Sequence, residues 1–171
     1  MIEKDLKNTM KPRIYLDMDG VLVDFESHLV KTVKMSINDW MKLGRKERWD
    51  PVIADTKFWH NAPWNNEGKK LFEYVKKFNP HILSAYVEHA HDPNCIPGKA
   101  HWARTKAGIP SQRINLVMRS QKKNFAKVAG QPAILIDDYE KNTSEFTKAG
   151  GIGITFKNAN QVIAELKKYG F

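Results

Sequence analysis

Five short apolar runs recur along the chain, and longer stretches of mixed apolar and polar residues separate them. The runs cover about residues 13–17, 81–84, 113–118, 133–136 and 152–156. Short apolar strands that alternate with helices are typical of a parallel sheet with helices on both faces. The pattern therefore predicts an α/β fold with a five-stranded parallel sheet.

Helices are predicted between these runs from apolar periodicity and from the residues that begin and end helices. The predicted ranges are about 97–108, 121–129, 142–150 and 160–169. Pro97 and Gly108, at the two ends of the first range, follow the usual asymmetry of helix termini. Asn142-Thr143-Ser144-Glu145 has the spacing of a helix cap, so we expect the third helix to begin there.

A long helical stretch without a strand pattern separates the first two apolar runs. Ser36 and Asp39 have the spacing of a capping box, and residues 67–78 form a second amphipathic pattern. We expect this stretch to be a small helical cap inserted into a core domain, with the cap at residues 26–78 and the core at residues 1–25 and 79–171.

Two of the predicted strands end in pairs of carboxylates. Asp17 and Asp19 follow the first strand, and Asp137 and Asp138 follow the fourth. Burying a carboxylate without a partner is costly, and open α/β sheets bind ligands at the carboxyl ends of their strands. Such acids could bind Mg²⁺, and one could attack as a nucleophile while another transfers a proton. The alternative is that Asp137 and Asp138 only cap the helix that follows.

A hydroxyl group and ammonium groups follow two further strands. Ser84 ends the second strand, and Lys122 and Lys123 begin the helix predicted after the third. Both kinds of group are suited to binding phosphate oxygens. Either signal alone is weak, because a serine at a strand end is usually part of a turn.

Taken in order, these groups resemble the four motifs of the haloacid dehalogenase superfamily, over about residues 14–156. The first motif is Asp17-Met18-Asp19-Gly20-Val21. Its continuation through Asp24-Phe25-Glu26 resembles the opening of the 5′(3′)-deoxyribonucleotidases within that superfamily. The threonine–serine pair that those enzymes have at the second motif is absent around Ser84.

The resemblance implies a phosphatase that works through an aspartyl-phosphate intermediate. Asp17 would be the nucleophile, and Asp19 would protonate the leaving alcohol and later activate water. The second aspartate favours phosphoryl transfer over dehalogenation in this superfamily. Ser84 would then bind the phosphoryl group.

The resemblance also implies a Mg²⁺ site and a lysine that balances the charge of the phosphate. The metal ligands would be the Asp17 carboxylate, the Asp19 main-chain carbonyl and an acid of the Asp137-Asp138 pair, with Asp137 preferred. The candidate lysines, in order of preference, are Lys122, Lys123 and Lys127.

Aromatic residues are concentrated in the predicted cap, which holds four of the five tryptophans. Large side chains can form the core of a small cap, or they can stack on a nucleobase. The segment 58–64 resembles the deoxyribonucleotidase cap, and the position of Phe25 faces the nucleoside in those enzymes. We therefore expect Phe25, Phe58 and Trp59 to contact the base or the sugar.

The composition agrees with a globular protein and adds one question about partners. The net charge of +9 attracts anions, but the lysines are spread over helices, which favours solvated surfaces over a nucleic-acid interface. A single cysteine excludes an intramolecular disulfide and suits a reducing compartment. Without an apolar span or a secretory signal, we expect a soluble cytoplasmic protein with no membrane partner.

A loop rich in histidine follows the second strand and suggests zinc as an alternative reading. Its possible ligands are His89, His91, Cys95 and His101. Their spacing fits no common zinc site well, so a surface loop is favoured.

The sequence predicts a Mg²⁺-dependent phosphomonoester hydrolase for small phosphate esters, with deoxyribonucleoside monophosphates as the preferred substrates. Sugar phosphates and phosphorylated 3′ ends of nucleic acid are alternative substrates. A non-catalytic module that binds nucleotides or nucleic acid is the alternative from another class, and intact motifs argue against it.

Overall fold

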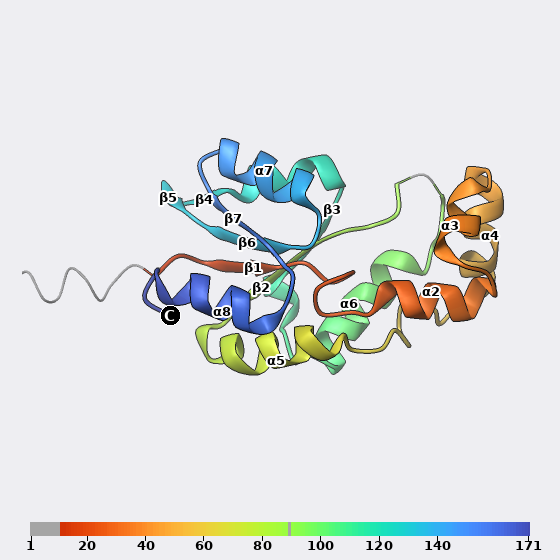
Figure 1. Cartoon of the computed structure of the whole chain (residues 1–171), viewed down its shortest axis with the longest axis horizontal. Coiled ribbons are helices and arrows are strands. Elements are labelled where there is room, and N and C mark those ends of the chain that lie inside the picture. The colour runs from red at the N-terminus through yellow and green to blue at the C-terminus, as the bar shows by residue number, and fades with distance from the viewer. Residues whose placement is uncertain (1–10, 89) are drawn as a thin grey trace, which may run out of the picture.

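The computed structural model describes residues 11–88 and 90–171 and contains a five-stranded parallel sheet (Figure 1). The order of the strands across the sheet is β3-β2-β1-β6-β7. This confirms the predicted α/β fold class. The strands are β1 (Ile14–Leu16), β2 (His81–Ala85), β3 (Ile114–Val117), β6 (Ile134–Asp137) and β7 (Ile152–Thr155).

The central strand β1 is buried on both faces, which explains why its sequence is continuously apolar. Ile14 and Leu16 belong to the apolar cluster on one face of the sheet, and Tyr15 belongs to the cluster on the other face. The strand lies between β2 and β6, and its register pairs Leu16 with Ile82 on one side and with Ile136 on the other.

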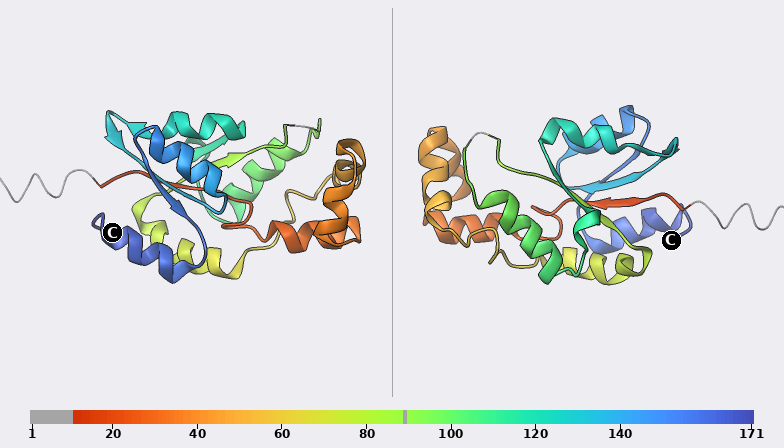
Figure 2. Two further views of the ribbon diagram at one scale, coloured as in Figure 1. Left: turned by 45° about the horizontal axis from the view of Figure 1, so that its top comes forward. Right: turned by 180° about the vertical axis from the view of Figure 1, so that it is seen from behind.

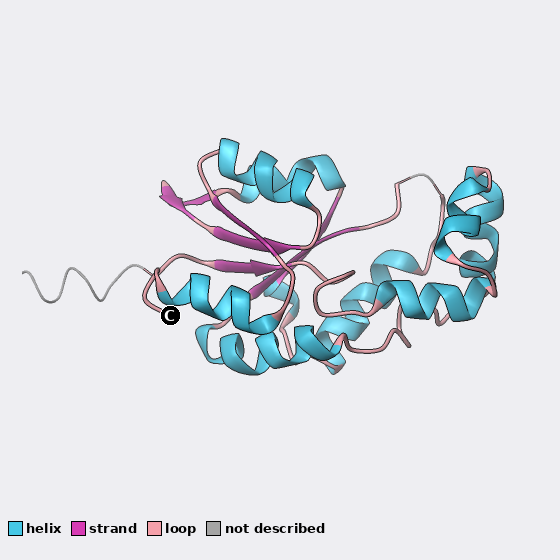
Figure 3. Cartoon of the chain, in the orientation of Figure 1, coloured by secondary structure: helices cyan, strands magenta, loops and turns pink. Residues whose placement is uncertain are grey.

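Helices cover both faces of the sheet (Figure 3). On the Leu16 face the apolar cluster includes side chains of α5 (Asn66–Val75), α6 (Cys95–Thr105) and α8 (Ala159–Lys167). On the Tyr15 face the sheet packs against α7 (Glu140–Lys148) and the segment around the 3₁₀ helix η3 (Arg119–Phe125). Two single turns of 3₁₀ helix, η1 (Lys76–Phe78) and η2 (Ser111–Arg113), precede β2 and β3.

Three helices between β1 and β2 extend beyond one end of the sheet: α2 (Phe25–Val33), α3 (Ile37–Lys42) and α4 (Arg45–Ala54) (Figure 2). They share an apolar cluster of their own, which includes Leu29, Val33, Trp40, Val52 and Phe58. Ser36 caps α3 by accepting a hydrogen bond from the Asp39 N–H (3.1 Å), as predicted. The helix α5, which the predicted cap includes, packs on the sheet beside α8 instead.

Two backbone segments connect these three helices to the sheet, and we call the pair the neck (residues 18–24 and 62–65). Hydrogen bonds hold the two segments side by side. The Asp24 N–H donates to the Pro63 carbonyl (3.0 Å), and the Asn65 N–H donates to the Leu22 carbonyl (2.7 Å). Val23 pairs with both Asp19 and Trp64 in isolated bridges, so the neck begins directly at the predicted catalytic acids.

Two predicted helices differ from the structure. Over 121–129 the helical turn ends at Phe125, and an antiparallel pair follows, β4 (Lys127–Val128) and β5 (Gln131–Pro132). Ala129 and Gly130 both have positive φ, which makes the two-residue turn that joins such strands. The next helix starts at Glu140, so Asn142 lies inside its first turn and does not cap it.

Within the described residues, no helix combines the length and the apolar character needed to cross a lipid bilayer.

Candidate active site

The two predicted pairs of acids meet at one edge of the sheet because β1 and β6 are neighbours. The Asp17 N–H donates to the Ile136 carbonyl (3.0 Å), which places Asp17 beside the end of β6. Carboxylate oxygens of Asp17, Asp137 and Asp138 lie within 4.8 Å of one another. The Asp19 carboxylate is not part of this group, and metal binding by the Asp19 main-chain carbonyl stays a prediction.

The electrostatics of this cluster fit a divalent cation. Burial, and then the charge of Asp17, raise the pKa of Asp137 to about 6 and that of Asp138 to about 7. For Asp137, burial and the charge of Asp17 therefore outweigh the opposing effect of the nearby Lys122 ammonium. Three carboxylates of this kind are hard oxygen ligands that suit Mg²⁺, whose charge would favour their ionised forms.

Lys122, the preferred candidate among the lysines, lies in this cluster and is buried. Its Nζ donates to Asp137 Oδ2 (2.6 Å) and is 3.2 Å from Asp17 Oδ1. Burial alone would lower the pKa of Lys122, but the Asp17 and Asp137 carboxylates outweigh burial and raise it. Lys123 and Lys127 are exposed, and neither lines the cavity at the acids.

Ser84 lies at the end of β2 and is fully buried, and its partner is a residue that the sequence analysis missed. The Lys99 ammonium donates to Ser84 Oγ (3.0 Å), to Asp19 Oδ2 (2.7 Å) and to the Ala85 carbonyl (2.8 Å). The sequence does contain a signal for Lys99, namely a charged residue at a position where an apolar one is expected. Lys99 lies on the buried stripe of α6, between Cys95 and Trp102.

A second set of missed residues holds Asp137 in place. The Asn142 side chain donates to Asp137 Oδ2 (3.0 Å), and the Tyr139 N–H donates to Asp137 Oδ1 (2.9 Å). Arg119 in turn donates to Asn142 Oδ1 (2.9 Å) and pairs with Glu145 (3.0 Å). These contacts fix the orientation of a predicted metal ligand.

A cavity of about 340 Å³ opens over these groups. Besides the acids, Ser84 and Lys122, it is lined by two aromatic residues, Phe25 and Tyr139. Phe25 is one of the three predicted substrate contacts. Tyr139 was not predicted, and half of its surface is exposed (51%).

The other two predicted substrate contacts, Phe58 and Trp59, are buried and do not line this cavity. Phe58 stacks on His28, with ring centroids 4.3 Å apart, and Trp59 donates its indole N–H to Asp92 (2.8 Å). Both side chains contribute to the core of the inserted helices, because a small helical unit needs large residues to bury enough apolar surface.

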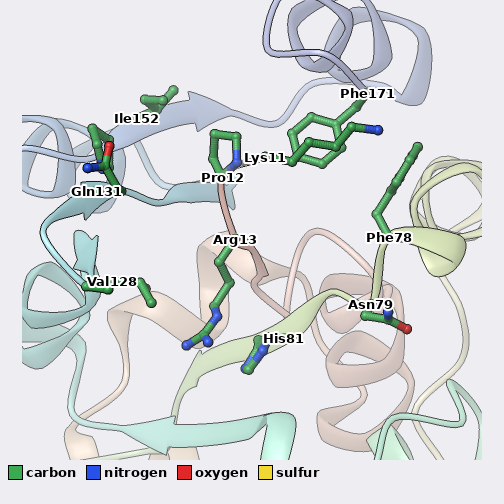
Figure 4. Close-up of a pocket in the computed structure, with 12 residues that line it drawn as sticks. Lys11, Pro12, Arg13, Phe78, Asn79, His81, Val128, Gln131, Ile152 and Phe171 are labelled. Atoms are coloured by element: carbon green, nitrogen blue, oxygen red, sulfur yellow. The ribbon is translucent and has the colours of Figure 1, made fainter. Parts of the chain in front are cut away.

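A larger hollow of about 550 Å³ lies at the opposite edge of the sheet, where the strands begin (Figure 4). Lys11, Arg13 and His81 line it together with apolar residues such as Phe78 and Phe171. None of the described residues that line it is an aspartate or a glutamate, so it offers no side-chain carboxylate for the predicted Mg²⁺.

The histidine-rich loop gives no support for zinc. Cys95 is buried among the side chains of the inserted helices, and His91 and His101 are exposed. His89 lies outside the described residues. In the part of the chain that the structure describes, the group with metal-ligand spacing is that of Asp17, Asp137 and Asp138.

The chain has the fold of the haloacid dehalogenase-like hydrolases. It is similar to a hydrolase from Streptococcus pneumoniae TIGR4, with a TM-score of 0.53 and 10% identity, covering 92% of this chain and 100% of that one. It is also similar to L-2-haloacid dehalogenase from Xanthobacter autotrophicus, with a TM-score of 0.51, 11% identity and coverage of 95% and 84%. A haloacid dehalogenase-like family hydrolase from Streptococcus pneumoniae gives a TM-score of 0.51, 13% identity and coverage of 93% and 90%.

In sequence, the chain is 29% identical over 136 residues to a protein of Vibrio phage KVP40 (isolate Vibrio parahaemolyticus/Japan/Matsuzaki/1991). The match covers 80% of this chain and 71% of the phage protein, which is provisionally named a 5′(3′)-deoxyribonucleotidase. No model of a protein family matches the sequence.

Proposed function

We propose that this protein is a Mg²⁺-dependent phosphomonoester hydrolase that acts on nucleoside monophosphates, with deoxyribonucleotides preferred. The observation that carries the proposal is the convergence of groups on one cavity. Four aspartates, a buried serine and the Lys122 ammonium line a space of about 340 Å³ at the carboxyl end of the sheet. A phosphate ester needs this combination of nucleophile, proton donor and positive charge.

Asp17 is the proposed nucleophile, and its two oxygens have different surroundings. Oδ1 accepts the Met18 N–H (2.8 Å) and lies 3.2 Å from Lys122 Nζ. This leaves Oδ2 to attack phosphorus. As that bond forms, the ester P–O bond breaks, and the proton of Asp19 moves to the leaving oxygen to give the alcohol.

Water then hydrolyses the aspartyl phosphate. Its oxygen bonds to phosphorus, its proton passes to Asp19, and the bond to Asp17 breaks, which releases phosphate and restores both acids. When bound, Mg²⁺ would be held by Asp17, Asp137 and Asp138 with the Asp19 carbonyl, and it would supply positive charge for the phosphate oxygens.

The substrate class is supported by the size and the aromatic lining of the cavity. Phe25 and Tyr139 offer ring surfaces on which a nucleobase can stack. The phage relative with a deoxyribonucleotidase name points to the same class. We propose that α2–α4 form the cap over this site and that Phe25, at the start of α2, brings the cap into contact with the substrate.

Phosphate release from a panel of esters tests the proposal. The panel holds deoxy- and ribonucleoside monophosphates, glucose 6-phosphate and a 3′-phosphorylated oligonucleotide, each with Mg²⁺ and with EDTA. We expect Mg²⁺-dependent release from the mononucleotides, with a loss of at least about 10³-fold in Asp17→Asn. The control is Asp50→Asn, an exposed aspartate on α4.

Two other outcomes would contradict part or all of the proposal. Release from glucose 6-phosphate or the oligonucleotide alone would keep the chemistry and discard the substrate class. If the wild-type protein releases phosphate from no ester and binds a nucleotide or an oligonucleotide, it is a binding module and the proposed hydrolase is wrong.

A further inference from the structure

Lys99 is a buried lysine that has no role in the mechanism proposed above. Only 1% of its surface is exposed, and it reaches the site from α6, a helix that carries none of the motif residues. A buried ammonium is costly unless it is fully hydrogen-bonded and paired with a charge. Lys99 satisfies that condition with residues of the proposed active site alone.

The contacts of Lys99 fix its ammonium group. A lysine has three N–H donors, and the three acceptors within reach are Asp19 Oδ2, Ser84 Oγ and the Ala85 carbonyl. The centroid of the Trp59 ring lies 5.3 Å from Lys99 Nζ, which adds a cation–π contact. This explains what the buried Trp59 contributes, although it does not line the cavity.

The two buried lysines divide the site between them. Lys122 binds Asp17 and Asp137, on the side of the nucleophile and the predicted metal. Lys99 binds Asp19 and Ser84, on the side of the proton donor and the predicted phosphoryl contact.

We propose that Lys99 is a positioning residue that holds the Asp19 carboxylate and the Ser84 hydroxyl in fixed relation to each other. This inference rests on the proposed function. Because Lys99 occupies Asp19 Oδ2, the transferable proton is carried by Oδ1. In the first step the O–H bond at Oδ1 breaks, and a new O–H bond forms at the leaving oxygen as that oxygen separates from phosphorus.

A residue that positions the proton donor has a signature that a purely structural residue lacks. An alkyl ester, such as a nucleotide, needs a proton on its leaving oxygen, whereas the oxygen of p-nitrophenyl phosphate leaves as a stable anion. Loss of Lys99 should therefore slow the alkyl ester much more than the nitrophenyl ester. The constant to compare is kcat/KM, which covers the steps up to the departure of the alcohol.

The experiment compares Lys99→Met with Lys106→Met, a control at the residue that directly follows the same helix. Lys106 donates to the Ala62 carbonyl (2.7 Å) and does not line the cavity. With a 2′-deoxyribonucleoside 5′-monophosphate, or glucose 6-phosphate if the panel selects it, we expect kcat/KM of Lys99→Met to fall about 100-fold. With p-nitrophenyl phosphate the fall should be less than about tenfold, and Lys106→Met should leave both constants within about twofold of wild type.

Equal losses on the two esters, or no loss on either, would overturn the inference while the proposed function stands. If Lys99→Met does not fold, as shown by its thermal unfolding, the same comparison is made with Lys99→Gln, which keeps a donor for Ser84. If the wild-type protein hydrolyses no ester, the proposed function itself fails and the role of Lys99 fails with it.

Discussion

Gly20 shows how a single residue without a side chain supports the acid cluster. Its φ is +79°, in the left-handed region, and a Cβ atom at this position would collide with the Asp138 carboxylate. Only glycine adopts this conformation without strain and also leaves room for the acid. Gly20 therefore does more than turn the chain within the first motif, because it leaves room for Asp138, a proposed metal ligand directly after another strand, β6.

We predict that Gly20→Ala weakens the binding of Mg²⁺. The added methyl group displaces Asp138, so the Mg²⁺ concentration for half-maximal phosphate release should rise about 10- to 100-fold. A titration of activity with Mg²⁺ measures this. Gly44→Ala is the control, because nothing lies within 4 Å of a Cβ there and its backbone suits alanine. A Mg²⁺ requirement equal to that of the control would contradict the prediction.

At the scale of elements, α5 packs closely against the neck. Gly68, in the first turns of α5, is buried, and a Cβ there would collide with the Val21 carbonyl. Glycine inside a helix usually costs about 1 kcal/mol relative to alanine. Here the helix retains it because the neck backbone occupies the space that a side chain would need.

We predict that Gly68→Ala destabilises the protein although alanine is the better helix former. The methyl group forces α5 and the neck apart, and the free energy of unfolding should fall by about 1–3 kcal/mol. Urea denaturation measures it, with Gly44→Ala expected to change stability by less than about 1 kcal/mol. If Gly68→Ala proves as stable as wild type, α5 and the neck are less tightly packed than described.

For the whole molecule, His81 makes the stability of the fold depend on pH. It lies at the end of the sheet where the strands begin, opposite the acids. Burial, and then the charges of Arg13 and Arg113, lower the pKa of His81 to about 4 from an ordinary 6.5. The folded state therefore favours the neutral imidazole. Its contribution to stability is complete above about pH 6.5 and is lost as the pH falls from there toward 4.

We predict that His81→Gln loses less stability than wild type between pH 7 and about 5. The variant has no imidazole to protonate, so its unfolding temperature should fall less over this range. Thermal unfolding in EDTA at several pH values tests this, because it leaves the metal site out of the comparison. His91→Gln, at an exposed histidine, is the control. Parallel curves for His81→Gln and wild type would contradict the prediction.

The sequence predicted the strands and the motif residues because both depend on local signals. Each strand is a short apolar run, and Asp17, Ser84 and Asp137 directly follow or end such runs. Lys122 was preferred as part of the family resemblance, and it is the candidate lysine that the fold brings to the acids.

The remaining differences come from contacts between distant segments. Lys99 joins Asp19 across 80 positions of sequence, and no local pattern specifies that pairing. Phe58 and Trp59 were expected at the substrate because an aromatic residue gives the same signal in a core as in a binding site. The helix predicted over 121–129 ends at Phe125, and the chain turns back after β4 at Ala129, whose left-handed conformation is rare for alanine.

The neck makes the inserted helices modular. Its two segments leave and return side by side, tied by the hydrogen bonds from Asp24 to Pro63 and from Asn65 to Leu22. A loop whose ends are already adjacent can be lengthened, shortened or exchanged without moving the sheet that supports it. If α2–α4 form the proposed cap, such an arrangement allows these helices and the substrate preference to change over evolutionary time, while the acids beside the neck keep their positions.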